Sequence, residues 1–325
     1  MTGKKEEIDR SVKEKLAPKQ FTKTPINGTK FTILVSSAKG GVGKSTVAIN
    51  IAFALQSLGL KIGILDADVY GPSLPKLINL NEKPKSEDGK AMMPLEKYDA
   101  QFMSMGFLVD EQTPMIWRGP MVISAIKTMT QKVLWKDRDV IIIDMPPGTG
   151  DTQLTFAQEV KVDGAIIVST PQDLALLDVK RGIQMFDKTG VKILGLIDNM
   201  SFFKGDDGKE YKIFGEGGVE KTAKEFNKEF LGHIPLNQDL RNSADIGDPL
   251  THSQPDHEVS KVFKTEKKVV SITLDPFRET ADTFRDNNHW PPKNEPTLFD
   301  IYKYDSSSWY GGSNPMQRAK QRDLK

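Results

Sequence analysis

The sequence contains no cysteine among its 325 residues and only four histidines. Without cysteine, disulfide bonds and thiolate-held metal ions are excluded for this chain on its own. His252 and His257 lie five residues apart, a spacing that does not place two side chains on one helix face, and Pro255 between them argues against a helix there. We therefore interpret them as surface histidines in a loop and predict no histidine metal site.

The sequence also has no strong charge imbalance and no long hydrophobic run. Its 45 basic and 44 acidic residues give a formal net charge of +1, so charge implies neither a nucleic-acid partner nor an anionic membrane surface. No apolar stretch approaches the roughly 20 residues that span a bilayer, and we expect no transmembrane segment. Residues 1–30 mix acidic and basic side chains, unlike a secretory signal or a transit peptide.

From residue 31 to about residue 240, apolar runs alternate with stretches of helical spacing. Strands are predicted at 31–36, 61–66, 140–144, 165–169, 193–197 and 230–234. Helices are predicted at 45–58, 121–134, 151–160 and 174–189. Several of the strands are continuous runs of Val, Ile and Leu, which is typical of strands buried on both faces of a parallel sheet. The pattern predicts an α/β fold with a doubly wound, mostly parallel sheet.

Two flanking segments do not follow this pattern. We predict a polar N-terminal arm at 1–29, a nucleotide-binding domain at 30–271, and an aromatic-rich extension at 272–325. The extension is rich in Trp, Tyr, Pro and Gly but poor in aliphatic residues, so we expect it to form no core of its own. Packing on its own domain and docking on a partner both remain open.

A glycine-rich segment connects predicted strand 31–36 to predicted helix 45–58. Its glycines allow backbone N–H groups to surround phosphate oxygens, and the helix N-terminus adds a favourable dipole. Lys44 is predicted to reach the β- and γ-phosphates, and Ser45 to place its hydroxyl on Mg²⁺. The sequence therefore predicts a Mg-ATP site at Gly40, Gly41, Val42, Gly43, Lys44, Ser45 and Thr46.

Carboxylates end two further predicted strands. Asp144 is predicted to hold Mg²⁺ directly or through water, and Asp66 is a second candidate ligand that supports the phosphate loop. Asp68 is the candidate for orienting the attacking water. Each aspartate alone could be a helix N-cap, but three of them beside a phosphate loop favour a magnesium site. The Met-Pro-Pro-Gly-Thr-Gly-Asp segment at 145–151 is predicted to sense the γ-phosphate through the Gly148 amide.

Lys39 is a second lysine inside the phosphate loop. The order Lys-Gly-Gly-Val-Gly-Lys-Ser-Thr at 39–46 resembles the deviant Walker A motif of the MinD/ParA/nitrogenase iron protein class of P-loop NTPases (the SIMIBI class). That resemblance implies an ATP-sandwich homodimer in which Lys39 reaches the partner's nucleotide. We therefore expect Lys39 to act in catalysis together with Lys44, Asp68 and Asp144, whose roles follow from the phosphate loop and the strand ends.

Six motifs, at 66–73, 117–120, 144–151, 199–201, 213–218 and 231–236, closely resemble those of the Mrp/ApbC family. Members of that family are homodimeric ATPases that carry iron–sulfur clusters, and a mitochondrial branch serves the assembly of respiratory complex I. The resemblance implies that Asn199 contacts adenine and that Pro235 flanks the base. It implies a soluble location: the mitochondrial matrix in a eukaryote, otherwise the cytoplasm.

One family feature is absent. The family follows Asn-Met-Ser with a Cys-x-x-Cys pair that holds a bridging cluster, whereas Gly205 and Gly208 stand at those positions here. The Gly-Asp-Asp-Gly-Lys run at 205–209 predicts a tight hairpin turn. Binding of a cluster by this chain is therefore doubtful, because clusters of this type need thiolates.

Three functions are compatible with these observations. The first is an ATPase, an ATP hydrolase if active, that acts in iron–sulfur protein assembly on client proteins. The second is a nucleotide-binding structural or assembly subunit of a larger complex, such as respiratory complex I, with little or no turnover. The third, a membrane-positioning ATPase, needs an amphipathic terminal helix. Residues 261–270 are a weak candidate for that helix and 317–325 are polar, so this hypothesis ranks last.

Overall fold

The computed structural model describes residues 23–86, 91–109, 119–264, 272–273 and 289–290. The predictions for residues 1–22, for Trp117 and Arg118, and for most of 272–325 therefore lie outside the described residues. The chain divides into two units, Met1–Val269 and Val270–Lys325. In the second unit, β10 (Ile272–Thr273) pairs antiparallel with β11 (His289–Trp290).

The first unit contains a nine-stranded sheet in the order β3-β4-β2-β5-β1-β6-β7-β8, with β9 paired to β7. The strands are β1 (Thr29–Ser36), β2 (Ile62–Asp66), β3 (Leu95–Lys97), β4 (Ala100–Ser104), β5 (Arg138–Asp144), β6 (Gly164–Ser169), β7 (Ile193–Lys204), β8 (Glu210–Tyr211) and β9 (Phe230–Leu236). Among the described strands of this sheet, β3–β4 and β7–β8 pair antiparallel and the other pairs are parallel. The prediction of a mostly parallel α/β sheet is confirmed.

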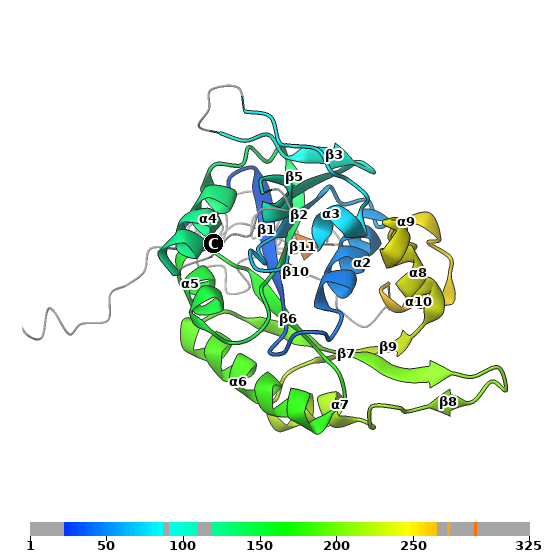
Figure 1. The fold of residues 1–325 in the computed structure, drawn as a ribbon. Coiled ribbons are helices and arrows are strands. Elements are labelled where there is room, and N and C mark those ends of the chain that lie inside the picture. The colour runs from blue at the N-terminus through cyan, green and yellow to red at the C-terminus, as the bar shows by residue number, and fades with distance from the viewer. Residues whose placement is uncertain (1–22, 87–90, 110–118, 265–271, 274–288, 291–325) are drawn as a thin grey trace, which may run out of the picture. The chain divides into compact units, whose positions relative to one another are not determined.

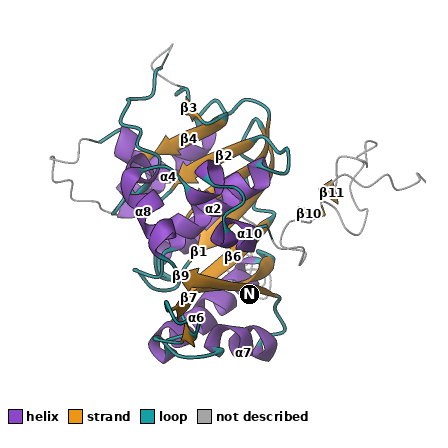
Figure 2. Cartoon of the chain, turned by 90° about the vertical axis from the view of Figure 1, so that its right-hand side faces the viewer, coloured by secondary structure: helices purple, strands orange, loops and turns teal. Residues whose placement is uncertain are grey.

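Helices cover both faces of this sheet (Figures 1 and 2). The described helices are α2 (Lys44–Gln56), α3 (Leu74–Leu77), α4 (Gly119–Gln131), α5 (Asp151–Glu159), α6 (Asp173–Thr189), α7 (Gly218–Glu225), α8 (Gln238–Ile246), α9 (Leu250–Ser253) and α10 (Glu258–Val262), with a 3-10 turn at Met105–Phe107. In Figure 1, α2, α3, α8, α9 and α10 lie on one side of the sheet, and α4, α5 and α6 lie on the other. In this three-layer arrangement α2, which follows the phosphate loop, packs against α9 and α3, and α8 packs against the same two helices.

The central strands form the core and fix the positions of the functional groups. β1, β2 and β5 are apolar and almost wholly buried, so they bury side chains against both helical layers. β5 pairs parallel with both neighbours, and Asp66 at the end of β2 lies in register with Asp144 at the end of β5. The carboxyl ends of these strands therefore meet beside the loop that leaves β1, as expected for a parallel sheet.

The predicted strands and helices are all present, with shifts of a few residues at their ends. The largest difference is in β7, predicted at 193–197 but extended to Lys204. Its last residues pair with β8 and β9, which lie on either side of Phe203. The short elements β3, β4, β8, α3 and α7 to α10 were not predicted, because two to nine residues give little periodicity.

Candidate nucleotide-binding site

The phosphate loop runs from the end of β1 to the start of α2. Gly41 and Gly43 adopt positive φ angles of 80° and 77°, which turn the backbone in the manner that glycine permits. The side-chain amide of Asn199 on β7 donates to the carbonyl of Val42 at 2.7 Å. A Cβ atom at Gly43 would lie only 2.4 Å from that amide nitrogen. The loop is therefore held against β7, and α2 begins at Lys44 with its N-terminal dipole directed at the loop.

Lys44 and Asp144 form a buried ion pair at this helix terminus. The ammonium group contacts one carboxylate oxygen of Asp144, and both side chains are 6% exposed. The same ammonium group lies 3.4 Å from the hydroxyl of Ser45. Since Mg²⁺ prefers oxygen ligands and keeps several waters, the Ser45 hydroxyl and the Asp144 carboxylate fit the predicted magnesium site. Within the described ranges, no group of three His, Asp or Glu side chains forms an all-protein metal cage.

Asp66 is fully buried and its two oxygens are already engaged by protein donors. Oδ1 accepts from the backbone of Asp68, and Oδ2 accepts from the backbone of Ser73 and Leu74 and from the Ser104 hydroxyl. Burial, and next the nearby carboxylate of Asp144, raise the pKa of Asp66 to about 7. Asp66 thus anchors the start of α3. Direct ligation of Mg²⁺ by this residue stays a prediction that would require exchange of these hydrogen bonds.

Asp68 lies in a pocket of about 540 Å³ between the segments that follow β2 and β5. Pro146, Pro147 and Gln153 line the same pocket. The Asp68 carboxylate accepts from the backbone of Tyr70 and Gly71, each at 3.2 Å. Burial raises the pKa of Asp68, opposed by the positive charge of Lys44.

The segment after β5 is tied to the end of β1. The Gly148 N–H donates to the carbonyl of Ser37 at 2.9 Å, and the buried Gln153 side chain contacts Ser36 and the carbonyls of Ser37 and Pro146. Sensing of a γ-phosphate through the Gly148 amide stays a prediction, since that amide would first have to leave Ser37. The sequence offered no signal for the role of Gln153.

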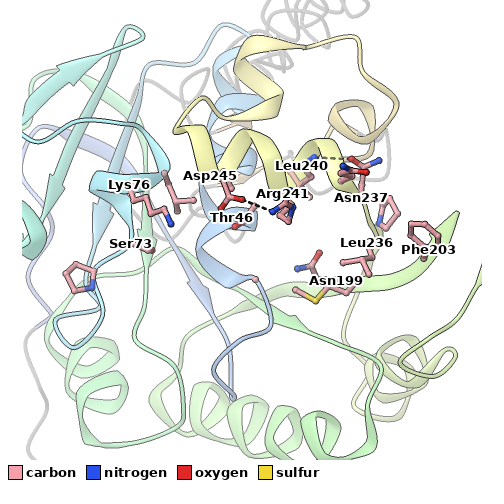
Figure 3. A pocket seen from close by; sticks show the side chains of 17 residues that line it. Thr46, Ser73, Lys76, Asn199, Phe203, Leu236, Asn237, Leu240, Arg241 and Asp245 are labelled. Carbon is pink, nitrogen blue, oxygen red and sulfur yellow. Dashed lines mark hydrogen bonds and ion pairs between the residues drawn. The ribbon is translucent and has the colours of Figure 1, made fainter. Parts of the chain in front are cut away.

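A larger pocket, of about 830 Å³, lies beside the phosphate loop between α2, β7, α3 and α8 (Figure 3). It brings together four of the predicted nucleotide contacts: Gly43, Thr46, Asn199 and Pro235. The site therefore has two parts, this larger pocket and the second pocket at Asp68, with Lys44, Ser45 and Asp144 at the loop. Sequence reasoning missed the wall formed by Lys76 on α3 and by Arg241 and Asp245 on α8. Only an (i, i+4) charge pair at 241 and 245 could have suggested it.

Lys39 is on the outside of the loop. It is exposed, as are Gly40 and Gly41, and its side chain makes no hydrogen bond or ion pair with the part of the chain that the structure describes. Its backbone carbonyl accepts from the Ser37 hydroxyl, which fixes the loop without restraining the ammonium group. An action of Lys39 on a second subunit remains a prediction.

The β7–β8 hairpin has a tight turn at the positions where the family has its cysteine pair. Gly205 and Lys209 pair through the Gly205 N–H, and the Gly208 N–H donates to the Gly205 carbonyl at 2.9 Å. Gly208 has φ 76°, so the turn has the three-residue form that needs glycine at its last position. Asp207 accepts from the backbone of Lys209 and from the Tyr211 hydroxyl. The prediction of a hairpin turn is confirmed.

The three histidines of the first unit contact protein side chains, and the loop prediction was wrong for one of them, His252. His252 lies in α9 and packs against the ring of Tyr98, with centroids 4.1 Å apart. His257 lies in the loop between α9 and α10, as predicted, where it caps α10 and its ring lies 3.3 Å from Asp239. His233 contacts the buried Asp198 at 3.1 Å on the face of β7 opposite to Asn199.

Comparisons with known proteins agree with this geometry. Residues 28–270 match the ParA family described as NUBPL iron-transfer P-loop NTPase. The iron-sulfur protein required for NADH dehydrogenase of Arabidopsis thaliana is 48% identical over 263 residues, which cover 80% of this chain and 84% of that protein. The iron-sulfur cluster carrier protein of Escherichia coli K12 is 47% identical over 241 residues, 74% of this chain and 65% of that protein.

Among solved structures, an Archaeoglobus fulgidus nucleotide-binding protein in complex with ADP has a TM-score of 0.63 and 34% identity, covering 73% of this chain and 93% of that chain. The MinD cell division ATPase of Pyrococcus furiosus has a TM-score of 0.53 at 20% identity, covering 74% and 96%, and shows the fold alone. Helices long and apolar enough to cross a membrane are absent from the described ranges. The chain belongs to the NUBPL/Mrp-like branch of the ParA family of P-loop NTPases.

Proposed function

We propose that the protein is a Mg-ATP-binding ATPase that acts in the assembly of iron–sulfur proteins. One observation carries this proposal. The buried Lys44–Asp144 pair and the Ser45 hydroxyl stand beside a pocket of about 830 Å³ that contains Thr46 and Asn199. A helix N-terminus, a buried cation and a neighbouring apolar pocket are what a nucleoside triphosphate requires. The relatives named for iron–sulfur cluster transfer give the site its context.

Each side chain has a role that follows from its position. Lys44 would exchange Asp144 for the β- and γ-phosphate oxygens, and this exchange would free the Asp144 carboxylate to hold the waters of Mg²⁺. Ser45 would contribute its hydroxyl to the ion, and the bound Mg²⁺ would supply neutralisation of charge on the phosphates. Asp68, in its pocket beside Pro146, would orient a water towards the γ-phosphate. Asn199 and Pro235 would contact the base.

A homodimer would complete the site. Lys39 is exposed at the outer edge of the loop, and its ammonium group makes no hydrogen bond or ion pair within the described part of its own chain. A cation in that position can reach the nucleotide of a second subunit, where it would stabilise charge that develops on the γ-phosphate. We expect ATP binding to bring the two copies together, in the mitochondrial matrix of a eukaryote or the cytoplasm of a bacterium.

The hairpin at Gly205 and Gly208 limits the part that this chain takes in cluster chemistry. Because the chain has no thiol, any cluster delivered to a client would be held mainly by a partner protein. The same hairpin supports the second candidate function, a nucleotide-binding subunit of a larger complex with little turnover. The relatives named as carriers and transfer proteins favour the first.

The test combines three measurements on the purified protein: ATP affinity, ATP turnover, and iron and labile sulfide after anaerobic reconstitution. Lys44→Ala is the control. Lys44-dependent binding with turnover supports the ATPase. Binding without turnover above the control would favour the nucleotide-held subunit, and absence of Lys44-dependent binding would contradict both.

A further inference from the structure

Two charged side chains on α8 form a wall of the large pocket that no nucleotide motif predicts. Arg241 and Asp245 are one helical turn apart and form an ion pair of 3.0 Å. Both line the pocket that contains Thr46 and Asn199, and Figure 3 shows both side chains extending from α8 towards its interior. Each remains more than half exposed, so the pair can contact a ligand without being uncovered first.

The helix that carries this pair is fixed at both ends. The Asn237 side chain accepts from the backbone of Asp239 and Leu240 and caps the start of α8. At the other end, Gly247 has φ 75° and packs closely on Asn79, such that a Cβ atom there would lie 2.5 Å from the Asn79 nitrogen. The positions of Arg241 and Asp245 are therefore preorganised relative to the pocket.

The charge of Asp245 restricts which part of a nucleotide it can contact. A carboxylate is repelled by phosphates, whose predicted place is at Gly43 and Lys44, where α2 begins. Asn199 and Pro235 are the predicted contacts of the base. A carboxylate only accepts hydrogen bonds, and between phosphates and base a nucleotide offers hydroxyl donors on its sugar. Asp245 matches those hydroxyls, and Arg241 both orients the carboxylate and offers donors to the ring oxygen.

Helix stabilisation alone is a weak explanation for the pair. Exposed (i, i+4) ion pairs contribute little to stability. The chain offers a matched pair, Glu220 and Lys224 on α7, which has the same spacing and does not line the pocket. Effects that are specific to Arg241 and Asp245 would thus arise from the pocket.

We propose that Asp245, positioned by Arg241, recognises the ribose hydroxyls, so that the site selects ribonucleotides over nucleotides that lack them. This inference rests on the proposed nucleotide binding and adds the sugar specificity of that site. The probe is 2′,3′-dideoxy-ATP, which keeps the base and the triphosphate and removes both hydroxyls.

Calorimetric titration of the wild-type protein should show that ATP binds about tenfold more tightly than 2′,3′-dideoxy-ATP, the effect of a hydrogen bond to a charged group. Asp245→Ala should lower ATP affinity to that of the dideoxy analogue and leave the analogue's affinity unchanged. Arg241→Gln should reduce the ratio in part, and Arg241→Lys should restore some of it. Glu220→Ala and Lys224→Gln should keep the wild-type ratio.

Equal wild-type affinities for the two nucleotides, with binding still dependent on Lys44, would overturn this inference and leave the proposed function standing. An unchanged ratio in Asp245→Ala would also overturn it. Absence of any Lys44-dependent binding would remove both proposals together.

Discussion

Strand β7 joins two regions of the molecule, the nucleotide site and the β7–β8 hairpin. The two regions differ in how many of the residues expected from the family resemblance are present. Asn199 lies against the phosphate loop, and four residues later Phe203 enters the hairpin that extends from the body of the protein in Figure 1. The first region holds every side-chain type that the predicted nucleotide chemistry needs. The second has Gly205 and Gly208 at the positions where the family resemblance implies cysteines.

The difference has a physical basis in how each region is held. Asp144 ends the buried strand β5, and Lys44 begins α2, which packs on the central strands, so their positions follow from the core of the protein. The hairpin depends on its own turn, with bonds between Gly205, Gly208 and Lys209 and a contact from Asp207 to Tyr211. One region can therefore change its chemistry while the other remains intact.

The largest expected effect is at Lys44. Lys44→Ala should weaken ATP binding by at least about a hundredfold, because a buried charge that pairs with phosphate is lost. It also leaves Asp144 beside Asp66 without its cation. Calorimetric titration measures the affinity, and Lys39→Ala, on the exposed edge of the loop, should retain binding. Comparable binding by Lys44→Ala would break the view that the first region is a working nucleotide site.

The next largest effect is on the free energy of unfolding. It distinguishes the contact of the phosphate loop with Asn199 from backbone strain in the loop. Gly43→Ala should lower the free energy of unfolding by about 2–3 kcal/mol, since it combines a strained φ of 77° with a clash against the Asn199 amide. Gly41→Ala is the matched control, with φ 80° and no atom within 4 Å of the added Cβ, and should cost about 1 kcal/mol. Urea unfolding of both variants measures the difference. Equal losses would show that the Asn199 contact is unimportant.

The parts of the fold that could be predicted are those with long-range regularity. The apolar runs at β1, β5 and β6 are typical of buried strands, and the glycine-rich loop before α2 is recognisable by spacing alone. By contrast, α8 has a polar sequence of nine residues, and its Arg241 and Asp245 belong to the pocket only because α8 packs beside α3. Such tertiary proximity leaves no local pattern.

The same reasoning explains why some details of the site differ from the predictions made from the sequence. The sequence placed Asp66 near magnesium, but it could not indicate that Ser73, Leu74 and Ser104 already donate to its oxygens. Nor could it indicate that the Gly148 amide pairs with Ser37. Hydrogen-bond partners that are distant along the chain are decided by packing, whereas residue types at fixed spacing are visible in the sequence.

A smaller loss of stability is expected when cysteines replace the two glycines of the hairpin. The double variant Gly205→Cys with Gly208→Cys should lose about 1–2 kcal/mol of stability, because Gly208 has φ 76° and a Cβ at Gly205 would lie 2.8 Å from the Tyr211 ring. We expect unchanged ATP affinity and no stoichiometric cluster after anaerobic reconstitution. Iron and sulfide at stoichiometric amounts, with stability unchanged, would contradict this expectation and show that two thiols suffice for the hairpin to hold a cluster.

The smallest effect on stability is expected at the contact between His233 on β9 and Asp198 on β7. The hydrogen bond to Asp198 raises the pKa of His233 above 6.5, with a further contribution from Glu220 and opposition from burial and Lys212. A raised folded-state pKa stabilises the fold fully below the unfolded pKa, and this stabilisation is lost as pH rises through the higher folded value. Because the His233 side chain is 40% exposed, we expect less than about 1 kcal/mol. Urea unfolding at pH 6 and pH 8 should show His233→Gln destabilised at the lower pH and close to wild type at the higher, with ATP affinity unchanged. A difference that is the same at both pH values would mean that His233 contributes packing on Phe230 rather than charge.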